Sequence, residues 1–183
     1  MSADFTQDHF ALFGLTRAFA LDTNALEQHY RELQIRVHPD KHAHLSDAER
    51  RLAMQWSTQV NEAYRTLRQP LRRAQYLLHL AGIDVQLEHN TAMPQEFLMQ
   101  QMEWREAVEE ARTGGDNHAL EHLHRRIKQE MAGQYQQLET QLDPAHEAYE
   151  ASDYTAAAGT VRQLMFQEKL LQEIDDALAS LET

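Results

Sequence analysis

"IRVHPDKHAHLSDAERR", which runs from Ile35 to Arg51, decides how the first third of the chain folds. His38, Pro39 and Asp40 stand together in it, and two more histidines follow within a few positions. Proline lacks a backbone N–H and disfavours helical geometry in the residue before it, so a helix has to end here. Histidine and aspartate at short spacing are also typical of metal and acid–base sites. The stretch therefore predicts either a corner between two helices or a small polar site.

The segment before this stretch has the apolar spacing of an α-helix. Its apolar residues recur at intervals of 4, 3 and 4 and are Leu26, Tyr30, Leu33 and Val37. This pattern predicts a helix over 22–37 that buries one face. Asp22 can cap its N-terminus, or Asn24 can do so, because Glu27 would then complete a capping box.

The segment after the stretch predicts a second, longer helix. Ser46 and Glu49 have the spacing of a capping box, and apolar residues then recur every three or four positions until Pro70. A shorter helix is expected over 71–81, where Gly82 ends it. A short apolar piece near the front of the chain ends at Gly14.

The remainder of the chain predicts a second helical domain. Three long periodic segments are expected to be helical, over 94–112, 116–142 and 154–181, and tight turns joining them suggest an antiparallel three-helix bundle. Asp143 and Pro144 either cap a short helix or kink the preceding one. The fold class is therefore all-α, with a helical domain over 1–82, a linker over 83–93 and a helical bundle over 94–183.

Composition narrows the function classes. The 183 residues contain no cysteine, which excludes disulfides, Cys-ligated clusters and thiol nucleophiles and fits a reducing cytoplasm. The net charge of −12 disfavours nucleic acid as a partner, since a phosphate backbone requires clustered cations. No apolar run reaches the roughly 20 residues that span a bilayer, and the N-terminus lacks the basic and apolar parts of a secretory signal. We expect a cytoplasmic protein that binds neither nucleic acid nor membrane.

A metal site or an enzyme active site in the opening stretch is the less favoured interpretation. The candidate ligands there are His38, Asp40, His42 and His44, but Pro39 and the expected turn give their side chains no common direction. His118 and His122 share a helix face elsewhere, which is more simply a solvated surface. The nucleophile-elbow, dinucleotide and P-loop motifs do not occur in the chain. We expect no catalytic residue, metal or cofactor.

A second motif follows the His-Pro-Asp residues about 20 positions later and helps to interpret them. This motif reads N-x-A-Y-x-x-L and consists of Asn61, Ala63, Tyr64 and Leu67. A His-Pro-Asp loop between antiparallel helices, followed by this motif, resembles the J-domain family. The segments "RRAQYLLHLAGID", "FLMQQMEWREAVEEA" and "VRQLMFQEKLLQEID" extend the resemblance to HscB-type co-chaperones of iron–sulfur cluster assembly. Over nearly the whole chain, the resemblance implies an N-terminal J-domain hairpin and a C-terminal three-helix domain.

The resemblance implies a first site, for a DnaK-type chaperone called HscA. Such co-chaperones are not enzymes themselves; they stimulate ATP hydrolysis by the chaperone. The residues matching the family's site are His38, Pro39, Asp40, Lys41, Arg31 and Arg36. Ile35 stands where a basic residue is common, and Val37 replaces a frequent tyrosine, so fewer charges are expected to contribute to docking.

The resemblance implies a second site, for the cluster scaffold protein IscU. The matching residues are Leu98, Met99, Met102, Glu103, Glu106, Glu110 and Phe166. Most of these share one face of the expected helix, and an apolar end that continues into carboxylates suits a protein interface. Two alternatives stay open: Leu98 and Met102 can be ordinary core residues, and a J-domain adaptor can deliver a different client. Gln100 and Ala107 replace acidic residues that are common in the family.

Overall fold

The computed structural model describes residues 6–37, 46–85, 93–142 and 151–181. These residues form seven α-helices and contain no strand, which confirms the predicted all-α class. The helices are α1 (His9–Leu12), α2 (Thr23–Val37), α3 (Asp47–Arg68), α4 (Pro70–Leu80), α5 (Gln95–Gly114), α6 (Asn117–Gln141) and α7 (Ala151–Leu181). The chain forms two compact units that divide between Leu77 and Leu78, within α4.

The helix starts around the opening stretch follow from side-chain capping. Asp22 accepts hydrogen bonds from the backbone N–H groups of Asn24 and Ala25, at 2.9 and 3.1 Å, so it caps α2. The alternative cap at Asn24 is therefore wrong. At the start of α3, the Ser46 side chain accepts from the backbone of Glu49 while the Glu49 carboxylate accepts from the backbone of Ser46. This confirms the predicted capping box.

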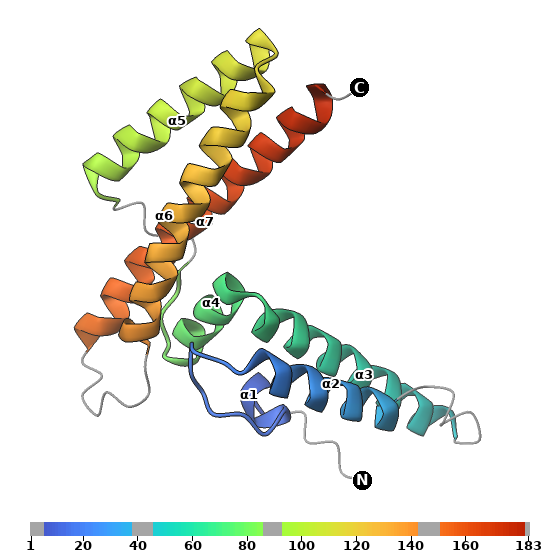
Figure 1. The fold of residues 1–183 in the computed structure, drawn as a ribbon. Helices are drawn as coiled ribbons and strands as arrows, with labels where there is room; N and C mark the ends of the chain where they lie inside the picture. Colours follow the sequence, from blue (N-terminus) through green and yellow to red (C-terminus); the bar gives the residue numbers. More distant parts are fainter. Residues whose placement is uncertain (1–5, 38–45, 86–92, 143–150, 182–183) are drawn as a thin grey trace. The chain divides into compact units, whose positions relative to one another are not determined.

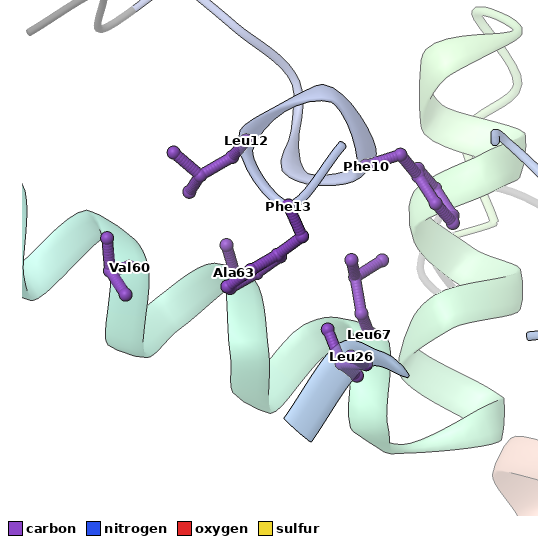
Figure 2. Close-up of a cluster of buried hydrophobic side chains, with 7 residues drawn as sticks. All are labelled: Phe10, Leu12, Phe13, Leu26, Val60, Ala63 and Leu67. Carbon is purple, nitrogen blue, oxygen red and sulfur yellow. The ribbon is translucent and has the colours of Figure 1, made fainter. Parts of the chain in front are cut away.

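The first unit is built around an antiparallel pair of helices, α2 and α3, with the short helix α1 packed against α3 (Figure 1). Its core is drawn in Figure 2, where Leu12 and Phe13 reach from α1 and its C-cap toward Val60 and Ala63 of α3. Each large side chain buried in this way stabilises the fold by about 1.5–3 kcal/mol. Leu52, the first apolar residue of the α3 pattern, is exposed and does not enter this core.

Hydrogen bonds and ring contacts join the start of α4 to the rest of the first unit. The buried Arg73 donates a hydrogen bond to the Leu67 carbonyl at 2.7 Å and lies 5.1 Å from the centre of the Phe19 ring. The hydroxyl of Tyr76 accepts a hydrogen bond from the backbone of His9, and the two rings stack with centroids 4.1 Å apart. The hydrogen bond and the ring contact of Arg73 explain why a cation lies in the interior of this unit.

The second unit is a bundle of α5, α6 and α7 in which each pair of helices is in contact (Figure 1). Gly115 adopts a left-handed conformation with φ of 68°, which ends α5 and lets the chain reverse. Asp116 then caps α6 by accepting from the backbone of Ala119 at 2.9 Å. Pro94 occupies the N-cap position of α5, so the helix begins at Gln95 and not at residue 94 as expected. Asp143 and Pro144, which were expected either to cap a short helix or to kink the preceding one, lie outside the described residues.

None of the described helices combines the length and the apolar character that crossing a bilayer requires.

Candidate partner-binding sites

The α2–α3 hairpin carries the first candidate site and is held together by two stacked tyrosines. The rings of Tyr30 and Tyr64 lie 3.8 Å apart and nearly parallel. The Tyr30 hydroxyl donates to Asn61 Oδ1 at 2.9 Å, and the Tyr64 hydroxyl donates to Glu27 Oε2 at 3.3 Å. The polar members of the N-x-A-Y motif therefore join α3 to α2. These contacts fix the first half of α2 against the C-terminal half of α3.

The His-Pro-Asp loop itself lies outside the described residues. His38, Pro39, Asp40 and Lys41 therefore stay a prediction as chaperone-binding residues. The structure describes the end of α2 at Val37 and the start of α3 at Asp47, as the opening stretch predicts.

Both predicted basic residues of α2 are exposed. Arg31 forms an ion pair with Glu27 at 2.7 Å, and its hydrogen bond lowers the pKa of that carboxyl group. Exposed pairs of this kind are weak, so Arg31 can exchange Glu27 for a partner's carboxylate at small cost. Arg36 lines a shallow depression of about 170 Å³ together with His29 and Glu32. The exposed side chain of Ile35 presents apolar surface on the same helix.

The second candidate site lies on α5, which carries two different stripes. One stripe is buried and faces the bundle; its members are Phe97, Gln101, Trp104, Val108 and Ala111. The other begins with Leu98, Met99 and Met102, which are 43%, 55% and 63% exposed. The alternative that Leu98 and Met102 are core residues is therefore wrong. We call these three residues the α5 apolar patch.

The α5 apolar patch continues into acidic residues along the helix. Glu103, Glu106 and Glu110 are all exposed. Phe166 is half-buried on α7 and packs edge-on against Phe97, with ring centroids 6.3 Å apart. Phe166 therefore lies at the level of the first turn of α5, where the apolar patch begins. The structure places the aromatic ring beside the apolar start of α5, and the run of carboxylates continues from there toward the end of the helix.

A polar group beneath this patch was missed by sequence reasoning. Gln100 of α5 and Gln167 of α7 both donate hydrogen bonds to the carboxylate of Glu130 on α6, at 3.3 and 3.2 Å. Each residue by itself is indistinguishable from a solvated polar position. Only the register between the three helices reveals the connection, and a single helix pattern does not contain it.

The histidines outside the opening stretch form no metal site among the described residues, where no group of three potential ligands occurs. His118 and His122 are exposed, as expected for a solvated face. His124 lies 3.2 Å from an Asp175 carboxylate oxygen on α7 and so joins α6 to α7. Whether His42 and His44 can bind metal lies outside the described part of the chain.

The family comparisons agree with this arrangement. The DnaJ domain model matches residues 8–76, and the HSCB C-terminal oligomerisation domain model matches residues 93–175. A protein of Aromatoleum aromaticum named co-chaperone protein HscB homolog is 56% identical over 183 residues, which is all of both chains. One of the same name from Ralstonia nicotianae is 53% identical over 175 residues, covering 95% of this chain and 96% of that protein.

Solved structures extend the similarity to the arrangement of helices. The chaperone HscB from Vibrio cholerae is 37% identical with a TM-score of 0.80, and the match covers 96% of this chain and 99% of that one. The human co-chaperone protein HscB is 29% identical with a TM-score of 0.84, and the match covers 96% of this chain and 84% of that one. With a J-domain, a matching C-terminal domain and full-length relatives that share more than half of its residues, the chain belongs to the HscB family of co-chaperones.

Proposed function

We propose that this co-chaperone binds the iron–sulfur scaffold protein IscU through α5 and α7 and stimulates the ATPase of the DnaK-type chaperone HscA. It would thereby bring the scaffold to the chaperone during maturation of iron–sulfur proteins, in the cytoplasm. It would catalyse no reaction and hold no cofactor of its own.

The observation that carries this proposal is the α5 apolar patch. A bundle whose core already contains Phe97 and Trp104 gains nothing from leaving Leu98, Met99 and Met102 in water. Methionine side chains adapt to the shape of a partner, and the neighbouring carboxylates can set its orientation. Phe166 adds the aromatic anchor that binding hot spots favour. This combination is what a protein-binding surface requires.

The chaperone half of the proposal depends on the hairpin. The stacked Tyr30 and Tyr64 join the two helices that precede and follow residues 38–45 in the sequence, and Arg31 and Arg36 lie exposed on α2. His38 and Asp40 would offer a donor and a carboxylate to the chaperone and would bias its ATPase switch without reacting. Lys41 and the α2 arginines would contribute long-range attraction that salt weakens.

The scaffold half is tested by titrating IscU into the purified protein by calorimetry. We expect binding in the range of tens of micromolar or tighter, and we expect Met99→Ala combined with Phe166→Ala to weaken it more than tenfold. The circular dichroism of the double variant should match the wild type. Wild-type protein that fails to bind IscU would favour a J-domain adaptor that delivers a different client.

Sedimentation of the protein alone belongs to the same test, because the C-terminal family model is described as an oligomerisation domain. A monomer that binds IscU supports the proposal. If Met99→Ala and Phe166→Ala instead convert an oligomer to a monomer without changing IscU binding, the patch joins copies of this chain.

A further inference from the structure

Three polar residues, one from each helix, meet inside the second unit at the level of the α5 apolar patch. Glu130 on α6 accepts from Gln100 on α5 through one carboxylate oxygen and from Gln167 on α7 through the other. Gln167 is fully buried, while Gln100 and Glu130 are half-buried. We call these three residues the polar layer. Its two hydrogen bonds join all three helices of the bundle.

The register of the helices places this layer directly beside the proposed binding surface. Gln100 follows Met99 in α5, and Gln167 follows Phe166 in α7. Two further α5–α7 contacts bracket the layer: the rings of Phe97 and Phe166 meet edge-on, and Arg105 lies 3.9 Å from Glu173. The polar layer therefore crosses the bundle at the level of Met99 and Phe166. At this level the position of α5 relative to α7 sets the distance between these two side chains.

A second polar contact in the same bundle provides a contrast. One turn away, Gln134 of α6 donates to Gln163 of α7 at 3.0 Å. This hydrogen bond repeats the α6–α7 register of Glu130 and Gln167, four residues further along one helix and four earlier along the other. It joins α6 and α7 only. The two contacts differ in the bond to α5 and in the charge of the Glu130 carboxylate.

The energetics argue against a purely stabilising role for the polar layer. Removing a carboxylate and an amide from water is costly, and apolar side chains of similar size at such positions are often as stable or more stable. Gln167 Oε1 has no hydrogen-bond partner among the described residues, which adds to that cost. A polar contact inside a helical assembly can select one register among several apolar packings. Leucine at these positions would remove the directional hydrogen bonds that tie α5 to one register.

We infer that Gln100, Glu130 and Gln167 are positioning residues for scaffold binding, which hold α5 in register with α7 so that Met99 and Phe166 form one surface. This inference rests on the proposed scaffold-binding function. Gln100 is one of the places where this chain departs from the acidic residues common in its family. Its amide can donate to Glu130, whereas a second carboxylate at that position would repel it.

The test compares three variants of the full-length protein in IscU titration and thermal melting. Glu130→Leu with Gln167→Leu removes the shared carboxylate and the buried amide of the layer, and it leaves the half-buried Gln100 reachable by water. We expect a melting temperature no lower than that of the wild type and IscU binding weakened by about tenfold, a range typical of residues that act through their neighbours. A merely structural role would lower the melting temperature instead.

Two matched variants complete the comparison. Glu130→Gln should bind within twofold of the wild type, because the new amide can accept from Gln100 and can donate to Gln167 Oε1 once the Gln167 amide turns over. Gln134→Leu with Gln163→Leu removes an α6–α7 polar contact that has no bond to α5. It should also bind within twofold, while Glu130→Gln controls for the lost charge. The inference is overturned if Glu130→Leu with Gln167→Leu binds like the wild type, or if the Gln134 and Gln163 control loses as much affinity.

A measurement without the scaffold separates this inference from the proposed function. Because the chain contains no cysteine, a pair of spin labels can be attached to one molecule through Thr113→Cys on α5 and Lys169→Cys on α7. Both positions are exposed. The distance distribution from pulsed electron paramagnetic resonance should be narrow in the labelled protein and should broaden after Glu130→Leu with Gln167→Leu. It should not broaden in the Gln134 and Gln163 control. An unchanged distribution would refute the positioning role, whether or not IscU binds.

Discussion

Replacing Met102 by alanine isolates the contribution of the α5 apolar patch, because this side chain is 63% exposed and touches little of its own bundle. Burial of a whole methionine side chain contributes about 1.5–3 kcal/mol. If a partner covers the exposed 63%, the substitution removes about 0.9–1.9 kcal/mol of binding free energy. That loss corresponds to roughly 5- to 25-fold weaker binding. Alanine is also a good helix former, so α5 should remain intact.

The chain contains a matched control for this substitution. Met54 on α3 is also 63% exposed, but it belongs to the first unit, whereas α5 belongs to the second. Calorimetric titration of IscU should show the loss for Met102→Ala and no change for Met54→Ala, with equal melting temperatures for both. Equal affinities of the Met102 variant and the wild type would refute the reasoning, because the most exposed patch residue would then lie outside the interface.

Two further predictions concern the first unit. Tyr30→Phe keeps the stacked rings but removes the hydrogen bond to Asn61, which should cost about 1 kcal/mol and lower the melting temperature of this unit by roughly 4–8 °C; an unchanged melting temperature would refute it. Burial lowers the pKa of His9, so protonation favours the unfolded chain and the melting temperature should fall as the pH drops from about 7.5 through 6.5 toward 5. His9→Phe, which can still stack on Tyr76, should show a shallower fall, and an equal slope in both proteins would contradict the assignment.

Local signals in the sequence predicted the elements of the fold closely. Pro39 predicted where α2 ends, and the capping box at Ser46 predicted where α3 begins. Both signals are reliable because proline geometry and side-chain caps act within a few residues. The choice between Asp22 and Asn24 as a cap was open, since both have suitable side chains. It is decided by which side chain reaches the free backbone N–H groups of the first turn.

The parts that could not be predicted depend on contacts between helices. Leu52 fits the apolar period of α3 but is exposed, because periodicity does not say where a neighbouring helix ends. The core alternative for Leu98 and Met102 stayed open in the sequence, because only the bundle identifies the other α5 stripe as the buried one. The shared bonds of Glu130 required the register of three helices. The chaperone-binding role of the His-Pro-Asp residues stays a prediction.

The central claim is that the protein couples scaffold binding to a chaperone's ATPase. Its most direct test is the steady-state ATP hydrolysis of purified HscA, measured with this protein, with IscU and with both. We predict stimulation by this protein alone and a further synergistic rise when IscU is present. His38→Gln should keep its circular dichroism and its affinity for IscU but lose both effects. Undiminished stimulation by the His38 variant, or no stimulation by the wild type, would contradict the account.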